Sequence, residues 1–446
     1  MTTWAGRTAA EISAAVREKR VTPREVVAEH LERIRRLDGR LGAFRLVRAE
    51  QALAEADEVA AHGDLSELPL AGVPVAVKDN VAVRGESRRV GSAATPDTPA
   101  ARDHVTVARL RAAGAVVVGL THVPELCVFG TTDGVLGTSR NPWDPARSAG
   151  GSSGGSATAV AAGMVPIALG NDGMGSLRIP AANCGLVSIK PGHGVVPAGE
   201  GSTWFGMTEH GPLATTVEDA RLMLSVLAGT APVPRSEPGT LRVAVSLRSP
   251  LAGVTISRPY ATAAREAAGV LMRAGHQVRR ADPPYPLSLA TTSLTHWAAG
   301  TAADAQGLES RLLTRRTRVH ARVGRPFVAG VRSGSGREQL RRRLEPFFSE
   351  YDVLLTPALA RRSPKAGPWH ERGWLSNVLA NTNYSPLTPA WNLTGWPAMA
   401  VPCGTLPSGA PGSVQLVGRP GSESRLLDLA AQLEERNPWR RTAPVN

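Results

Sequence analysis

Short apolar segments alternate with helix-like segments along this chain, and this alternation limits the fold more than any other feature. Residues 75–77 and 115–120 are rich in valine, as buried strands are, whereas residues 105–113 between them are helix-like and stop before a glycine. Residues 260–274 form another helix-like segment, and a strand-like segment begins at residues 276–278. Such alternation is typical of α/β proteins, so we expect an α/β sandwich with a large, mostly parallel or mixed sheet.

The size and composition of the chain fit one elaborate domain. With 446 residues, of which 42% are hydrophobic, the chain can bury a large core. We expect a single domain over residues 1–446, with a more variable, substrate-side region at about residues 232–350 that begins with a proline- and glycine-rich stretch.

The formal net charge of +13 raises the question of nucleic-acid binding. Arginines are densest between residues 311 and 343, but the arginine clusters there, such as residues 341–343, lack interleaved aromatic residues. We therefore expect a solvated helical face in this segment and no nucleic-acid partner.

The cysteines and the apolar runs indicate a reduced, cytoplasmic setting. Cys127, Cys184 and Cys403 lie far apart and fit neither a metal-binding spacing nor a disulfide framework. The first 20 residues carry charges throughout, and the longest apolar runs, at about residues 112–120 and 157–169, are too short to span a membrane. We expect neither secretion nor membrane anchoring.

Two glycine-rich segments, each with a serine at its centre, carry the chemistry. Ser152 lies in a Gly-Gly-Ser-Ser-Gly-Gly run, and Ser176 follows the run Gly-Asn-Asp-Gly-Met-Gly. Glycine has no Cβ, so backbone of this kind can approach a ligand closely. Upstream, Lys78 ends the apolar strand-like segment. Two serines and a lysine form a plausible set for acyl transfer.

Two other interpretations of the first glycine-rich segment are weaker. Residues 151–155 formally match the G-x-S-x-G nucleophile elbow of α/β-hydrolases, but that motif needs a strand directly before it, and residues 141–145 read as a loop. A glycine-rich loop before a helix can also cradle phosphate, but no Lys-Ser/Thr pair completes a Walker motif here.

An ordered series of motifs along most of the chain resembles the amidase signature family, serine hydrolases with a Ser-cisSer-Lys triad. The matching segments are residues 72–80, 141–145, 150–157, 170–180, 185–191, 211–214, 217–220, 351–357, 392–395, 397–398 and 415–418. The resemblance implies a single large mixed β-sheet core flanked by helices on both faces. It also implies an enzyme that needs no metal and no organic cofactor.

The resemblance assigns a role to each residue of the triad. Ser176 is the expected nucleophile, Ser152 the bridging serine preceded by a cis peptide bond, and Lys78 the base. The expected oxyanion hole is formed by backbone N–H groups of Gly173, Met174, Gly175 and Ser176, with supporting roles for Asp172, Arg178 and Ser153.

Met174 departs from the family pattern, which has a glycine at this position of the turn. The change preserves the backbone donor, but a Cβ would cost about 1 to 2 kcal/mol if the position required a positive φ. The thioether would in either case reshape the adjoining space.

These observations predict an amide hydrolase that works through an acyl-enzyme and releases a carboxylic acid together with ammonia or an amine. Acyl transfer by aminolysis of the acyl-enzyme is the alternative. A third interpretation is an amidotransferase-type subunit or a catalytically weak scaffold acting in a complex. Tryptophans such as Trp204 and Trp297 suit a small-molecule amide with an aryl or apolar acyl group. The sequence leaves a homodimer open.

Overall fold

An 11-stranded mixed sheet runs through the molecule in the strand order β1-β3-β2-β8-β10-β9-β14-β15-β13-β11-β12. The structure is a computed structural model that describes residues 3–199, 203–231 and 234–445. The strands of this sheet are β1 Phe44–Val47, β2 Pro74–Lys78, β3 Val116–Thr121, β8 Ile167–Asp172, β9 Val187–Lys190, β10 Glu209–Ala214, β11 Arg242–Val245, β12 Gln277–Arg280, β13 Val353–Pro357, β14 Ala398–Thr405 and β15 Pro411–Val417.

The predicted strand–helix–strand unit is present at the centre of the N-terminal half. Strand β2 pairs in parallel with β3, and helix α4 (Val105–Ala112) connects them in the chain. On its other side β2 pairs in parallel with β8. Further along the chain, helix α8 (Arg258–Arg273) precedes β12, as expected for residues 260–278. Strands β8, β10 and β9 pair antiparallel, so the sheet is mixed.

Helices cover both faces of the sheet because the side chains of its central strands alternate between two cores. Val75 and Val77 of β2 belong to a core that includes residues of α1 (Ala9–Arg17), α4, α7 (Val217–Ala228), α8 and α15 (Glu423–Arg436). Ala76, between them, belongs to a core that includes residues of α2 (Pro23–Leu41), α3 (Ala49–Ala60) and α5 (Gly154–Ala161). The prediction of a large mixed sheet with helices on both faces is confirmed.

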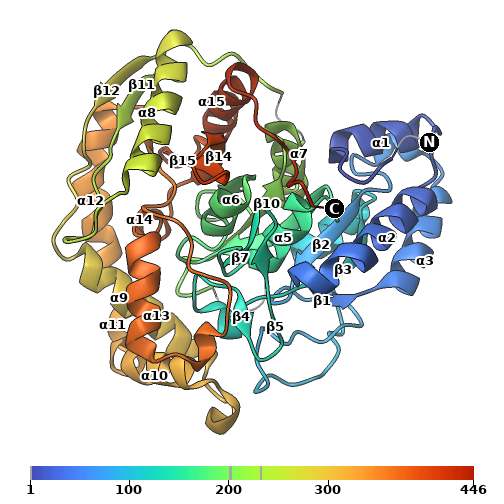
Figure 1. Cartoon of the computed structure of the whole chain (residues 1–446), viewed down its shortest axis with the longest axis horizontal. Coiled ribbons are helices and arrows are strands. Elements are labelled where there is room, and N and C mark those ends of the chain that lie inside the picture. The colour runs from blue at the N-terminus through green and yellow to red at the C-terminus, as the bar shows by residue number, and fades with distance from the viewer. Residues whose placement is uncertain (1–2, 200–202, 232–233, 446) are drawn as a thin grey trace.

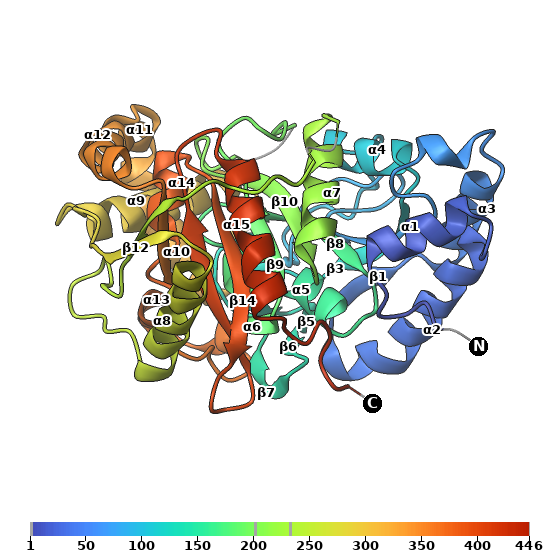
Figure 2. The same ribbon diagram turned by 90° about the horizontal axis from the view of Figure 1, so that it is seen from above.

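Helices α9 to α14 gather at one end of the molecule, opposite the end formed by α1 to α3 (Figures 1 and 2). They form a third core with β11 and β13, which includes residues of α9 (Leu289–Asp304), α12 (Ser335–Glu350), α13 (Trp374–Tyr384) and α14 (Pro389–Thr394). Helices α10 (Arg315–Gly324) and α11 (Val328–Arg332) contact α9. The region expected at residues 232–350 supplies most of this end; its residues 232–233 lie outside the described part. The one-domain organisation stays a prediction.

The sequence predicted a solvated helical face for the arginine-rich segment, but the structure shows that some of its arginines contact other segments. Arg316 on α10 is fully buried, with Nη1 3.2 Å from Asp133 Oδ1 and its guanidinium 4.7 Å from the ring centre of Phe129. Arg337 donates to the carbonyl of Leu393 at 2.9 Å. These arginines hold neighbouring segments together because their long side chains reach carbonyl and carboxylate oxygens of other segments.

A second difference concerns residues 141–145, which were expected to be a loop. They form the turn and the adjoining strand ends of a hairpin of β6 (Arg140–Asn141) and β7 (Asp144–Ser148) outside the main sheet. A further hairpin, β4 (Asp133–Gly134) with β5 (Gly137–Thr138), precedes it.

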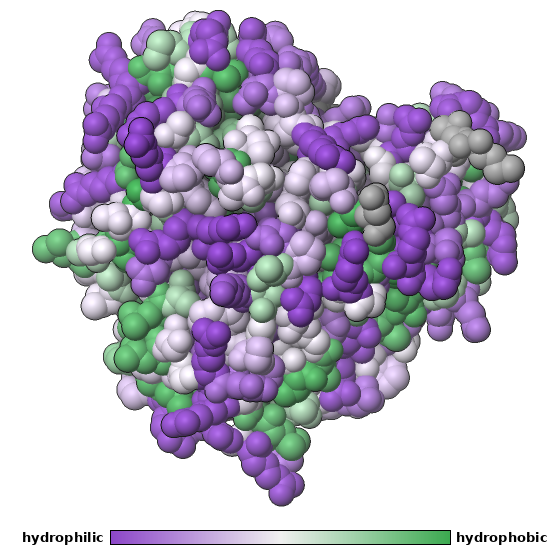
Figure 3. All heavy atoms as spheres, viewed as in Figure 1, coloured by the Kyte–Doolittle hydropathy of each residue, from purple (hydrophilic) through white to green (hydrophobic). Residues whose placement is uncertain are grey.

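Within the described ranges, none of the helices has both the length and the apolar character needed to cross a membrane. Hydrophilic side chains are spread over the face in Figure 3, with hydrophobic ones between them.

Candidate active site

Parallel pairing of β2 and β8 brings the lysine and the second glycine-rich segment together. Val77 of β2 is aligned with Leu169 of β8, so the carboxyl ends of both strands lie at one edge of the sheet. Lys78 is the last residue of β2, and Asp172 is the last residue of β8. The turn that contains Ser176 follows directly and leads into helix α6 (Arg178–Cys184).

Lys78 is fully buried and is held by three oxygen acceptors. Its Nζ lies 2.8 Å from Ser152 Oγ, 2.7 Å from Asn171 Oδ1 and 3.2 Å from the Asn171 carbonyl oxygen. Burial lowers the pKa of Lys78, and the neighbouring Asp172 charge only partly opposes this effect. The structure therefore joins Lys78 and Ser152 and favours the neutral amine.

The first glycine-rich segment carries Ser152 between the β6–β7 hairpin and α5. The Gly151–Ser152 peptide bond is cis. Ser153 ties this segment to the second one, since its N–H donates to the Ser176 carbonyl at 3.2 Å and its Oγ donates to the Asn171 carbonyl at 3.2 Å. Among the described residues, no hydrogen bond joins Ser152 Oγ to Ser176 Oγ, although both residues line the same cavity.

The turn from Gly173 to Ser176 has its left-handed backbone at Gly175, where φ is +122°. Met174 does not have a positive φ, so the strain considered for a Cβ at that position does not arise. The Gly175 N–H donates to Asp172 Oδ1 at 2.5 Å and is not available to a substrate, in contrast to the expectation from sequence. Hydrogen bonds within the described residues leave the N–H groups of Gly173, Met174 and Ser176 unused.

Asp172 and Arg178 brace this turn as a fully buried ion pair. Burial alone would raise the pKa of the Asp172 carboxyl, but the Arg178 charge and the hydrogen bonds hold it well below its usual range. Asn392 donates to Asp172 Oδ1 at 2.9 Å, and Arg178 Nη1 donates to the Thr388 carbonyl at 3.0 Å. Helix α14 is thereby attached to the turn.

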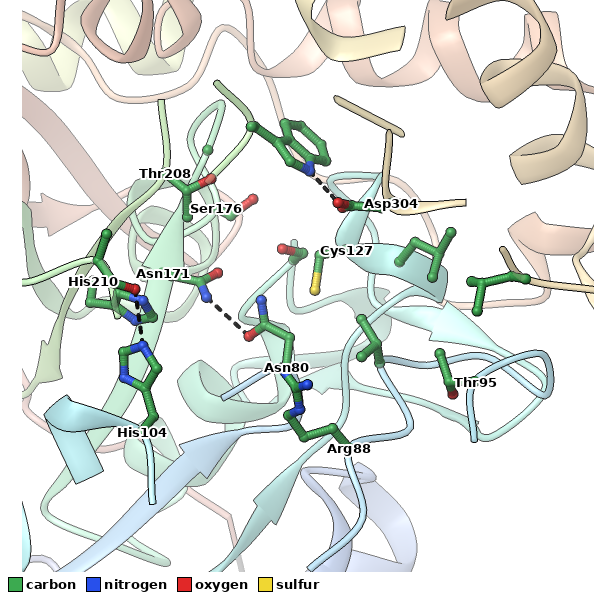
Figure 4. Close-up of a pocket in the computed structure, with 17 residues that line it drawn as sticks. Asn80, Arg88, Thr95, His104, Cys127, Asn171, Ser176, Thr208, His210 and Asp304 are labelled. Carbon is green, nitrogen blue, oxygen red and sulfur yellow. Dashed lines mark hydrogen bonds between the residues drawn. The ribbon is translucent and has the colours of Figure 1, made fainter. Parts of the chain in front are cut away.

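Ser176 lies between two cavities that differ in polarity. The first, of about 200 Å³, is the more polar of the two and is lined by Ser152, Ser176, Asn80, Arg88, Thr95, His104, Cys127, Asn171, Gly173, Trp204, Thr208, His210, Asp304 and four further residues (Figure 4). The second, of about 220 Å³, is largely apolar and is lined by Ser176, Met174, Val128, Phe129, Ile179, Leu251, Leu294, Trp297, Val378 and nine further residues. We call them the polar cavity and the apolar cavity.

The polar cavity contains groups that stay uncharged near neutral pH. Burial lowers the pKa of His210 to about 3, with a smaller contribution from the nearby His104. Burial also raises the pKa of the Cys127 thiol, although Lys78 and Ser152 oppose this. A protonated thiol is a poor nucleophile. Cys127 therefore lines the cavity as a small, uncharged side chain.

Sequence reasoning missed three polar residues that complete the site. Asn171 Oδ1 accepts a hydrogen bond from Lys78 Nζ, and Asn171 Nδ2 donates to Asn80 Oδ1 at 3.0 Å. Asn392 holds the Asp172 carboxylate. All three stand inside the segments that carry the family resemblance, and Asn80 and Asn171 are each adjacent in sequence to an aspartate, which was the available signal for these two.

No group of three or more histidine, cysteine, aspartate or glutamate residues is arranged to hold a metal ion in the part of the chain that the structure describes.

Comparison with known proteins gives a consistent result. The family model described as Amidase matches residues 25–427. AmiB2 of Mycobacterium tuberculosis, a relative named as an amidase, is 42% identical over 434 residues, which cover 93% of each chain. The solved structure of a 6-aminohexanoate cyclic dimer hydrolase with substrate is similar with a TM-score of 0.87 and 28% identity, covering 100% of this chain and 99% of that one. A bacterial aryl acylamidase of the amidase signature family is similar with a TM-score of 0.87 and 25% identity, covering 98% of both chains.

Proposed function

Because this chain belongs to the amidase signature family and is an amide hydrolase, we propose that it cleaves amides with Ser176 as nucleophile, Ser152 as bridging serine and Lys78 as base. The observation that carries the proposal is the buried hydrogen bond of 2.8 Å between Lys78 Nζ and Ser152 Oγ, with Ser176 facing the same cavity. A lysine can act as a base only when it is neutral, and its burial favours that form.

In the first step the Ser176 oxygen bonds to the amide carbonyl carbon and the C–N bond breaks. The Ser176 proton passes to Ser152, the Ser152 proton passes to Lys78, and a proton returns along the same path to the leaving nitrogen. This requires Ser152 Oγ and Ser176 Oγ to come within hydrogen-bond distance when substrate is bound, since such contacts are often longer in empty sites.

In the second step a water molecule attacks the acyl-enzyme. The water oxygen bonds to the carbonyl carbon, the bond to Ser176 breaks, and Ser176 regains its proton. The products are a carboxylic acid and ammonia or an amine. We assign stabilisation of the oxyanion in both steps to the backbone N–H groups of Gly173, Met174 and Ser176.

The apolar cavity suits an aryl or branched acyl group. Phe129 and Trp297 meet edge to face within it, with ring centres 5.5 Å apart, and the Trp297 indole N–H is satisfied by the Val128 carbonyl at 2.7 Å. The wall therefore presents carbon surface rather than unpaired polar groups. The free cysteines Cys127, Cys184 and Cys403 fit a reducing, cytoplasmic setting.

A serine-reactive fluorophosphonate tests the nucleophile. Mass spectrometry of the labelled protein should find the adduct on Ser176, and labelling should be lost in Ser176→Ala and weakened in Lys78→Ala. Ser293→Ala is the matched control, because this serine also lines the apolar cavity. Release of amine from aryl-acyl amides should follow the same pattern. An adduct on another residue, or full hydrolysis by Ser176→Ala, contradicts the assignment.

A further inference from the structure

The two cavities receive different halves of the substrate. Given the proposed function, on which this inference rests, the leaving nitrogen takes its proton from Ser152. Ser152 lines the polar cavity, whereas Ser176 lines both cavities. The amine half must therefore lie on the polar side of Ser176, and the acyl half on the apolar side.

Arg88 gives the polar cavity a cation without a partner. Arg88 is an exposed residue that lines the cavity, and within the described residues its side chain forms no hydrogen bond and no ion pair. Figure 4 shows Arg88 on the side of the cavity opposite Ser176, with Asn80 drawn between them.

The carboxylates on the segments around Arg88 are all engaged by other arginines. Asp79 pairs with Arg45 at 2.7 Å, Glu86 with Arg48 at 2.8 Å, Asp97 with Arg89 at 3.1 Å and Asp103 with Arg111 at 3.1 Å. The Arg88 guanidinium is thus free to bind an anion that enters the cavity. A guanidinium matches a carboxylate in shape, with two parallel N–H···O bonds.

We propose that the amine half of the substrate carries a carboxylate that pairs with Arg88, so that the enzyme hydrolyses N-acyl amino acids with an apolar acyl group. Water adds across the C–N bond, and the products are an apolar carboxylic acid and an amino acid. The carboxylate lies across the polar cavity from the cleaved bond, so the number of carbons between nitrogen and carboxylate affects the rate.

The test compares matched substrates. N-phenylacetyl derivatives of glycine, β-alanine and γ-aminobutyrate are each paired with the corresponding uncharged carboxamide, and amine release gives kcat/KM. At least one carboxylate should exceed its carboxamide by about tenfold, the expected value of a charge-assisted hydrogen-bond pair. The preference should arise mainly in KM and weaken with added salt.

Arg88→Gln should bring the carboxylate-to-carboxamide ratio close to one, and Arg88→Lys should restore part of it. Arg84→Gln is the matched control, since Arg84 is an exposed arginine of the same loop that lines neither cavity. It should keep the wild-type ratio. A wild-type ratio near one, or an unchanged ratio in Arg88→Gln, overturns the proposal.

A binding measurement separates this proposal from the proposed function. Calorimetry on Ser176→Ala gives Kd for the same pairs without turnover, and the Kd ratio should depend on Arg88 in the same way. If the wild type hydrolyses none of the amides but the Kd ratio holds, the proposed function fails and the Arg88 site stands. If carboxamides are hydrolysed and carboxylates are neither preferred nor bound more tightly, the Arg88 site fails alone.

Discussion

Arg178 and Asp172 form a buried ion pair with two contacts, Nε to Oδ2 at 2.9 Å and Nη2 to Oδ1 at 3.0 Å, beneath the turn that carries Ser176. Removing one partner leaves the other charge buried. Asp172→Ala should therefore lower the free energy of unfolding by about 3 to 5 kcal/mol, measured by urea denaturation. Asp352→Ala breaks the more exposed ion pair with Arg242 and should lower the free energy of unfolding by at most about 1 kcal/mol. Equal effects in the two variants would count against the bracing role.

The same pair gives a pH dependence to stability. The pKa of Asp172 is lowered in the folded state, so the folded state binds fewer protons than the unfolded state. The contribution of the pair is fully present above the unfolded pKa of about 3.9 and is lost as the pH falls toward the folded pKa. The Asp172→Asn variant should show a smaller loss of stability than the wild type between about pH 5 and pH 2, measured by urea denaturation at each pH.

The buried position of Lys78 predicts how activity depends on pH. Since the neutral amine is the base and burial lowers its pKa, kcat/KM for an uncharged amide should rise with pH and reach a plateau with a midpoint below the ordinary value of about 10.4. Lys78→Ala should lower kcat by about 10²- to 10⁴-fold and abolish the rising limb. A profile that falls over this range is incompatible with a lysine base.

Met174 lines the apolar cavity, so Met174→Gly should change substrate preference. The wider cavity should favour bulkier acyl groups, such as naphthoyl over acetyl, by several-fold in relative kcat/KM. The cost in stability should stay near 1 kcal/mol, because a glycine loses more chain entropy on folding. Identical preference profiles for the two proteins would show that the thioether does not shape the acyl site.

Gly175 permits no side chain. A Cβ there would lie 2.3 Å from Thr388 Oγ1, and φ is +122°. Gly175→Ala should lower the free energy of unfolding by about 1 to 3 kcal/mol and should reduce kcat, because the turn must shift to relieve the contact. Gly367→Ala is the control, since a Cβ at Gly367 meets nothing within 4 Å. A wild-type kcat and unfolding curve for Gly175→Ala would contradict the geometry.

Much of the fold followed from local patterns. The valine-rich segments became β2 and β3 because strands buried on both faces leave continuous apolar runs, and the segment between them became α4, which ends just before Gly114. The hairpin at residues 140–148 was missed because its strands lie outside the main sheet and carry little apolar periodicity. Arg316 was misjudged because its burial depends on Asp133, which is distant in sequence.

The residues of the site could be predicted from the sequence where a short motif contains them. Lys78 and Ser152, expected to interact, are in hydrogen-bond contact. Other features of the site depend on which residues lie close together in the folded chain. These are the hydrogen bonds of the Asn171 and Asn392 side chains, the hydrogen bond of the Gly175 N–H and the free guanidinium of Arg88. No spacing rule in the sequence encodes these contacts.

The position of Ser176 between two dissimilar chambers fixes the order in which products would depart. The amine, once cleaved, can diffuse from its own chamber while the acyl group is still tethered in the other. Steady-state kinetics would then be ping-pong. Added amine would re-enter the vacated chamber, react with the acyl-enzyme and so exchange with the amine half of the substrate. Added acid would compete with substrate for the free enzyme.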